Sequence, residues 1–195
     1  MSRREGYALH PKAHKYMVKR STIPGQHGRT SRRSVASQYA LQLREKQKVK
    51  RLYGLLERQF SNLMSEASRK EGQSGAILLE LLERRADNAV YRAGFAPSRR
   101  SARQLVTHGH FLLNGRRVDI PSIRLKSGDV LSVRPKSLKS EYFKNLDDVT
   151  GNPEITVSWL KANRKKFEIT ITGVPSREEA EPDINEQLIV EYYSR

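Results

Sequence analysis

The chain has 195 residues, of which 36% are hydrophobic, and it carries a formal net charge of +16. It contains no cysteine, which excludes a disulfide framework and thiolate chemistry, and no apolar run reaches the length of a membrane span. So large a positive charge favours a polyanionic partner, usually a nucleic acid, over a merely solubilising surface.

The positive charge is concentrated in the first two thirds of the chain. Residues 1–75 have a net charge of +12, residues 76–136 of +7 and residues 137–195 of −3. We therefore expect the first two segments to face the polyanion, and the last to pack, turn outward or meet a basic protein neighbour. The start of the chain lacks the apolar stretch of a secretory signal.

The first third of the chain predicts a basic arm followed by a helix. Segment 1–37 shows little periodicity, and its Pro24-Gly25-Gln26-His27-Gly28 run predicts a turn-rich loop. We expect this arm to be loosely ordered alone and fixed on RNA. Apolar residues three and four apart predict a helix over 38–69, with a break or a close helix contact at Gly54. A linker is expected over 69–75.

The middle of the chain predicts two further helices. Residues 76–93 carry one apolar stripe. Ser98 or Ser101 can cap the next helix, which is expected to run to His108. Gly109 fits the left-handed position that ends a helix.

Strands are expected after this helix. Asn114-Gly115 lies between two short runs with apolar residues and is a strong hairpin signal, and a second turn at Ser127-Gly128-Asp129 leads into another strand. Residues 137–150 predict a polar connector or irregular helix, and residues 173–186 an acidic surface loop. Three later runs predict strands, namely Ile155–Trp159, Phe167–Ile171 and Leu188–Tyr192.

The arginines of the middle segment suggest a surface that binds RNA. No acidic residue occurs in 98–117, whereas a solvated face usually mixes both signs. Arginine grips phosphate bidentately and stacks on bases. Aromatic residues are few there, among them Phe95 and Phe111, which favours recognition of folded RNA by shape and backbone. The predicted RNA-binding residues are Arg29, Arg32, Arg33, Arg44, Lys46, Lys48, Lys50, Arg51, Arg84, Arg99, Arg100, Arg103, His108, His110, Asn114, Arg116, Arg117, Arg124 and Lys126.

Other chemistry finds little support in the sequence. His108 and His110 suit packing at a helix end or contact with RNA, and the residues alone leave both open. His10 and His14 are too few for a structural zinc site, so no metal is expected. Asp87 lies among arginines and is expected to orient them through an ion pair. We find no catalytic, nucleotide-binding or cofactor motif, which predicts a protein that is not an enzyme and has no cofactor.

Residues 84–134 resemble the αL-type RNA-binding module, which also occurs in pseudouridine synthases, tyrosyl-tRNA synthetases and a heat-shock protein. The segments that carry this resemblance are 85–96, 101–110, 114–118 and 128–130. The flanking segments make nearly the whole chain resemble the family of small-subunit ribosomal protein four, of the bacterial and organellar type. They are Pro-Gly-Gln-His-Gly (24–28), Leu-Arg-Glu-Lys-Gln-Lys (43–48), Tyr-Gly-Leu-Leu-Glu-Arg-Gln-Phe (53–60) and the C-terminal 185–195.

This resemblance implies an α+β fold with a mostly helical N-terminal domain, an inserted αL-type RNA-binding module of two helices plus a small antiparallel sheet, and a C-terminal strand region. The domains it implies are a basic, loop-rich arm at 1–37, a helical domain at 38–83 completed by 176–195, and an inserted domain at 84–175 with the module at 84–134. Both ends of the chain are expected to be complete, with no transit peptide.

The resemblance also implies the function. Members of this family are structural constituents of the small ribosomal subunit and bind its RNA early in assembly. The implied partners are small-subunit ribosomal RNA, ribosomal proteins three and five, and messenger RNA near the channel through which it enters. The contact with protein five affects translational accuracy. The zinc-binding cysteines of many relatives are missing here, so no metal is carried over. The location is expected to be a cytoplasmic or organellar ribosome, without membrane contact. The alternatives are a ribosome-rescue factor or an rRNA-modifying enzyme that carries the same module.

Overall fold

The computed structural model describes residues 1–20, 22–28, 36–151 and 157–194, and it divides the chain into two compact units. Unit 1 comprises Met1–Leu78 and Asp183–Arg195, and unit 2 comprises Leu79–Pro182. Two separate stretches of chain therefore build unit 1. Helix α5 (Ser74–Glu83) spans the boundary between the units.

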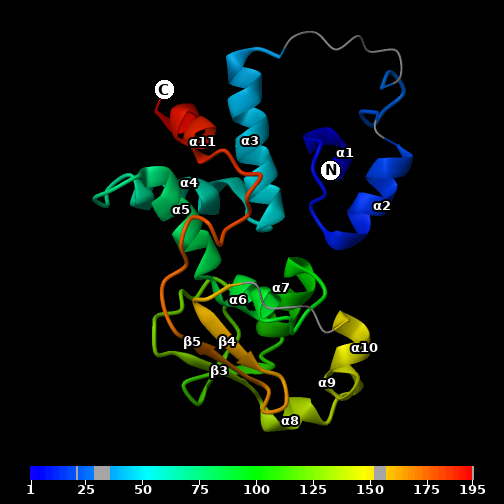
Figure 1. Ribbon diagram of the computed structural model, residues 1–195, viewed down its shortest axis with the longest axis vertical. Helices are drawn as coiled ribbons and strands as arrows, with labels where there is room; N and C mark the ends of the chain where they lie inside the picture. Colours follow the sequence, from blue (N-terminus) through cyan, green and yellow to red (C-terminus); the bar gives the residue numbers. More distant parts are fainter. Residues whose placement is uncertain (21, 29–35, 152–156, 195) are drawn as a thin grey trace. The chain divides into compact units, whose positions relative to one another are not determined.

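Unit 1 is built from helices that surround a small apolar core. Helix α11 lies along α3, and α1 also contacts α3 (Figure 1). Val49, Phe60 and Ile189 are fully buried and belong to three different helices. The predicted helix over 38–69 is interrupted at Gly54, whose φ of 67° is the left-handed region that glycine tolerates. The helices are α1 (Ser2–Glu5), α2 (Pro11–Lys19), α3 (Gln38–Leu52), α4 (Glu57–Ala67) and α11 (Glu186–Tyr193).

Two parts of unit 1 differ from the expectation. Helices α1 and α2 lie in the segment 1–37 for which loops were expected. The strand predicted at Leu188–Tyr192 is wrong, because these residues belong to helix α11. The Asn185 side chain caps this helix by accepting a hydrogen bond from the Leu188 amide, and packing of the helix on α3 overrides the strand preference of its β-branched and aromatic residues.

Unit 2 begins with helices that are separated by extended residues. The helix predicted over 76–93 is divided into α5 and α6 (Ala86–Arg92), because Arg85 is extended and pairs with Arg124. The Ala86 amide also donates to the Ile123 carbonyl over 2.8 Å. Helix α7 (Arg99–Thr107) follows and ends before Gly109, which has a φ of 69°, as predicted.

A five-stranded antiparallel sheet completes unit 2, in the order β2-β1-β3-β5-β4. The predicted hairpin turns at Asn114 and Gly115, whose positive φ angles of 49° and 82° are those of a type I′ turn. Strand β5 pairs with β3, so the sheet extends beyond the small sheet expected for the module. The strands are β1 (Phe111–Leu113), β2 (Arg116–Val118), β3 (Val130–Val133), β4 (Leu160–Asn163) and β5 (Glu168–Ile171).

The later elements of unit 2 only partly follow the predictions. The irregular helix expected over 137–150 is present as α8 (Pro135–Leu138), α9 (Glu141–Lys144) and α10 (Leu146–Thr150). Strand β5 lies within the predicted run 167–171. Of the strand predicted at 155–159, residues 155 and 156 lie outside the described residues. The prediction is wrong for 157–159, which precede β4 and are not part of a strand.

One apolar core cluster joins α6 and α7 to the sheet. Ala89, Val106, Phe111 and Ile169 are fully buried in it. Burying a large apolar side chain contributes roughly 1.5–3 kcal/mol, so this cluster fixes both helices on the sheet. None of the helices in the described ranges is long and apolar enough to cross a membrane.

Candidate nucleic-acid interface

Helix α7 directs Arg100 outward because its other face is held in the core. Ala102, Leu105 and Val106 are buried, whereas Arg100 is exposed. The Ser98 hydroxyl caps the helix by accepting a hydrogen bond from the Ser101 amide over 3.2 Å. Helix amino ends favour acidic residues, but the first turn of α7 contains none and begins with two arginines. The charge of Arg100, for which no ion pair is found in the described residues, therefore lies where an external anion is attracted.

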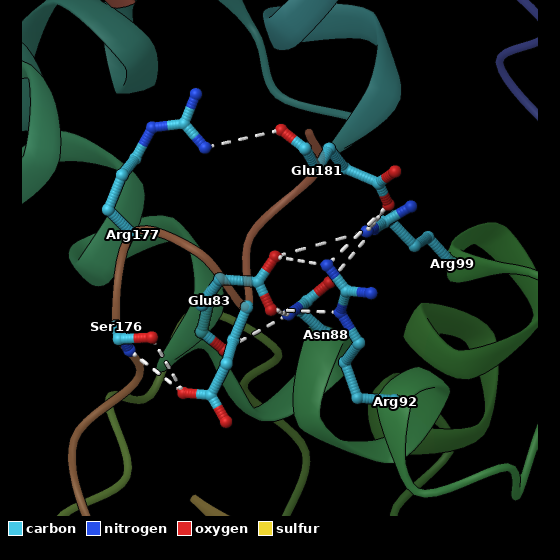
Figure 2. A network of polar contacts seen from close by, with 8 residues as sticks. Glu83, Asn88, Arg92, Arg99, Ser176, Arg177 and Glu181 are labelled. Atoms are coloured by element: carbon cyan, nitrogen blue, oxygen red, sulfur yellow. Dashed lines mark hydrogen bonds and ion pairs between the residues drawn. The ribbon is translucent and has the colours of Figure 1, made fainter. Parts of the chain in front are cut away.

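A buried carboxylate organises the cations beside α7 (Figure 2). Glu83 is fully buried and accepts two hydrogen bonds from the Arg92 guanidinium, over 3.0 and 2.9 Å. The Asn88 side-chain amide donates to the same carboxylate over 2.7 Å. Arg99 donates to the Asn88 side-chain oxygen and to Glu181, over 2.8 and 2.7 Å. Arg99, a predicted RNA-binding residue, is thus engaged within the protein.

Arg84 and Arg103 are also paired. Arg84 donates to Glu80 over 2.8 Å and to the Leu125 carbonyl over 3.0 Å. Asp87 accepts both bonds of a bidentate pair from Arg85, over 3.0 and 2.8 Å, and lies 3.9 Å from the half-buried Arg103. Asp87 therefore forms the ion pairs with arginines that the sequence predicted.

The two turns of the sheet are tied together by side chains. The Asn114 amide donates to Asp129 over 2.9 Å, and the Asn114 oxygen accepts from the Val130 amide over 2.9 Å. The second oxygen of Asp129 accepts from the Lys126 amide over 2.7 Å. The polar atoms of the exposed Asn114 side chain therefore bond to other groups of the protein and hold the hairpin turn next to Lys126.

The carboxyl end of α7 carries a further cationic group. The Arg117 guanidinium lies against Gly109, where an added Cβ would come within 2.5 Å of its Nε. His108 is exposed. His110 is half-buried, with Nδ1 2.9 Å from the Ser137 hydroxyl and its ring 5.8 Å from that of Phe143.

Burial lowers the pKa of His110, and electrostatic interaction with His108 and Arg134 lowers it further. The sequence left open whether these histidines pack at the helix end or contact RNA. The contacts of His110 are those of a packed residue, whereas the exposed ring of His108 leaves contact with RNA open.

Among the predicted RNA-binding residues of unit 2, four cations are exposed and form no ion pair with an acidic side chain in the described residues, and we call them the exposed cation set. A planar guanidinium carries five donors, so such groups hold the phosphate oxygens of a nucleic-acid backbone well. Arg124 is exposed as well but has an interaction of its own. The exposed cation set consists of Arg100, Arg116, Arg117 and Lys126.

The cations of α3 are arranged differently, and we call them the paired cation set. Each has an acidic partner in unit 1. Lys46 is only 4% exposed and, with Lys50, donates to Glu57. Lys48 pairs with Glu45 over 2.7 Å. The two arginines share the Glu5 carboxylate. The paired cation set consists of Arg44, Lys46, Lys48, Lys50 and Arg51.

Glu57 shows the strength of this pairing. Burial alone raises the pKa of the Glu57 carboxyl, but hydrogen bonds from Lys46 and Lys50 outweigh that effect and lower the pKa to about 2. Lys46 also lies 4.4 Å from the ring centre of Tyr192, and the Tyr193 hydroxyl donates to Glu57 over 3.2 Å. Lys46 thus joins α3, α4 and α11.

The remaining predicted residues, Arg29, Arg32 and Arg33, lie outside the described residues. Sequence reasoning identified Asp87 as a partner of arginines but missed the other pairing carboxylates, of which Glu5 and Glu181 are distant in the sequence from the cations that they pair. Local signals that could have found some of them are the helical spacings Glu45–Lys48 and Glu80–Arg84, and the position of Glu83 four residues after the buried Leu79 on the same side of helix α5. In the part of the chain that the structure describes, no cluster of three His, Asp or Glu side chains could hold a metal ion.

Comparison with known proteins matches two family models to consecutive parts of the chain. Residues 1–83 match the family model of the ribosomal protein S4/S9 N-terminal domain, and residues 84–131 match the S4 domain. Together the two matches define the class, a ribosomal protein that carries an S4-type RNA-binding domain.

The relatives are similar over nearly their full length. The small ribosomal subunit protein uS4 of Chloroflexus aurantiacus is 52% identical over 196 residues, which cover 100% of this chain and 95% of that protein. The protein of the same name from Clostridioides difficile is 52% identical over 199 residues, covering 99% and 94%. The chain therefore belongs to the family of small ribosomal subunit protein uS4, a family of ribosomal structural proteins rather than of enzymes. The resemblance seen in the sequence is confirmed.

Proposed function

We propose that this protein is a structural constituent of the small ribosomal subunit that binds its RNA directly and early in assembly. Family membership supports the ribosomal role. The single observation that carries direct binding is the exposed cation set of unit 2, which has no acidic partner in the described residues. Cations that neutralise phosphates release counterions, so binding should weaken steeply with salt.

A salt titration with two charge-matched variants tests this proposal. The first variant replaces three members of the exposed cation set, Arg100, Arg116 and Arg117, by alanine. The control variant replaces Lys161, Lys165 and Lys166, which are exposed on or next to β4. Because β4 and β2 form opposite edges of the sheet, four strand spacings, or about 19 Å, separate the control from Arg116 and Arg117.

The expected result is a change in the slope of log affinity against log salt on a small-subunit RNA transcript. The first variant should lower the slope by about one unit for each lost phosphate contact, whereas the control should leave it nearly unchanged. Equal losses in both variants would mean that only overall charge matters, and direct binding through this surface would then be rejected.

The finer roles follow from the family and stay part of the proposal. We propose that the protein nucleates the subunit body, contacts ribosomal proteins three and five, lies near the messenger RNA and influences accuracy together with protein five. The relatives are bacterial, which favours the ribosomes of a bacterial cytoplasm. Reconstitution of the subunit without this protein should then stop at an early particle. A complete particle formed at the normal rate would contradict nucleation.

Association with the subunit separates this role from ribosome rescue. A structural constituent should co-migrate with small subunits in a sucrose gradient at raised salt and remain bound after subunits are recycled. A rescue factor should be released under both conditions. Full-length similarity to uS4 proteins, rather than similarity of the S4 domain alone, favours the structural role.

A further inference from the structure

One contact in unit 1 joins the first helix of the chain to two predicted RNA-binding residues. The Glu5 side chain is fully buried, and its Oε1 atom accepts from the Nη1 atoms of both Arg44, over 3.3 Å, and Arg51. The two arginines are seven residues apart on α3, about 10 Å along the helix axis, and they converge on one oxygen. A carboxylate held between two guanidinium groups marks a preformed anion site.

Glu5 fills this site incompletely. Its second oxygen, Oε2, is buried and has no hydrogen-bond partner. A buried charged oxygen without a partner destabilises the arrangement that holds it. Each guanidinium has five donors, of which one bonds to Glu5, and the side chains of Arg44 and Arg51 remain 38% and 28% exposed. A larger anion with several acceptor oxygens would use more of these donors.

The segment that carries Glu5 is short. Helix α1 has only four residues and no side-chain cap, and besides the buried Glu5 side chain it is held by a hydrogen bond from Arg3 to the Thr22 carbonyl over 2.9 Å. Helices of this length are not stable by themselves in water, so α1 keeps its place through contacts with its neighbours. Local opening of such a terminal element costs far less than unfolding the unit.

We propose that Arg44 and Arg51 form a site for an RNA backbone phosphate, and that Glu5 occupies this site until RNA displaces it. This inference rests on the proposed function, because it assigns two cations of the RNA-binding protein to one phosphate. It also separates the paired cation set into two kinds. Lys46 is buried among α3, α4 and α11 and stays a packing residue, whereas the two arginines are released when α1 moves away.

The first experiment removes the occupant. The variants Glu5→Ala and Glu5→Gln should bind small-subunit RNA about tenfold more tightly than the wild type, because the phosphate no longer competes with a carboxylate. Losing one negative charge also strengthens binding in general. The matched control is therefore Glu71→Gln, an exposed acid of unit 1, which should change the affinity by less than about threefold.

A second measurement follows the displacement itself. The chain has no cysteine, so cysteines introduced at Arg4 and Leu41, both exposed, can carry a pair of distance labels. The distance between α1 and α3 should widen when RNA binds to the otherwise unchanged chain. This readout does not depend on how well the Glu5 variants fold.

The outcomes distinguish this inference from the proposed function. If the wild type binds the RNA with a steep salt dependence, but Glu5→Gln behaves like Glu71→Gln and the label distance stays constant, then Glu5 is only a structural clamp and the inference is rejected. If the wild type shows no salt-dependent RNA binding at all, the proposed function itself is rejected.

Discussion

The paired cation set of unit 1 and the exposed cation set of unit 2 hold their positive charge in opposite ways. In unit 1 the cations of α3 are paired with Glu5, Glu45 and Glu57. In unit 2 the exposed cation set has no acidic partner within the described residues, while two buried carboxylates, Glu83 and Asp87, pair with other arginines. The difference shows that net charge and available charge are separate quantities. Only cations that are exposed and have no acidic partner can bind a phosphate without a prior rearrangement.

Removing a buried pairing carboxylate should give the largest effect on stability. Glu83→Ala removes the buried carboxylate to which Arg92 and the Asn88 amide donate, and should lower the free energy of unfolding of unit 2 by about 3–5 kcal/mol. The single tryptophan, Trp159, is buried in unit 2, so its fluorescence during urea denaturation reports on this unit. The exposed Glu178→Ala control should change stability by less than about 0.5 kcal/mol. A loss below 1 kcal/mol for Glu83→Ala would show that the pairing does not hold the fold.

Asp129, an acid next to Lys126 of the exposed cation set, provides a test in which charge and geometry predict opposite changes in RNA affinity. Asp129→Ala increases the net positive charge, but it breaks the bonds that hold Asn114 and Lys126 together. We expect a loss of about 1–2 kcal/mol in unfolding free energy and weaker RNA binding. The exposed Asp119→Ala control should keep or strengthen RNA binding. Stronger binding by both variants would mean that charge alone governs the surface.

The pKa of Glu57 predicts how unit 1 responds to acid. Because the pKa is about 2 in the folded protein and 4.5 in a model carboxyl group, the carboxylate stabilises unit 1 above about pH 4.5, and this contribution is lost as the pH falls towards 2. The side chain is half exposed, so solvent screening limits the effect to about 1 kcal/mol. Glu57→Gln should therefore be less stable than the wild type at pH 7 and similar to it near pH 2, by urea denaturation followed through helical circular dichroism. An equal difference at both pH values would contradict this assignment.

The features that the sequence predicts correctly depend on local chemistry. The hairpin at Asn114-Gly115, the Ser98 cap and the helix end at Gly109 each require particular residues at adjacent positions. The strand predicted at 188–192 was wrong because packing on α3 outweighs local preference there.

The pairing of Arg44 and Arg51 with Glu5 could not be predicted in the same way. Glu5 lies 39 and 46 residues before the arginines that it joins, and no local pattern records such a distance. The sequence therefore indicates which residues carry charge and suggests a partner of opposite sign. Which of those charges remain available depends on the folded chain.

The smallest expected effect on stability tests whether the exposed cation set is kept for function. Arg100 lies in the first turn of α7, where a cation opposes the helix dipole and no acid is present to offset it. Arg100→Gln should therefore raise the free energy of unfolding by about 0.3–1 kcal/mol at low salt, and the gain should shrink as salt is added. The same change should weaken RNA binding and lower its salt slope by about one unit. Lys161→Gln, which lies on β4 away from any helix end, should change neither quantity appreciably. A residue that destabilises the free protein yet strengthens its complex is best explained by the complex. A loss of stability in Arg100→Gln would instead show that Arg100 stabilises the fold. The exposed cation set would then differ from the paired cation set only in how strongly its members contribute to stability.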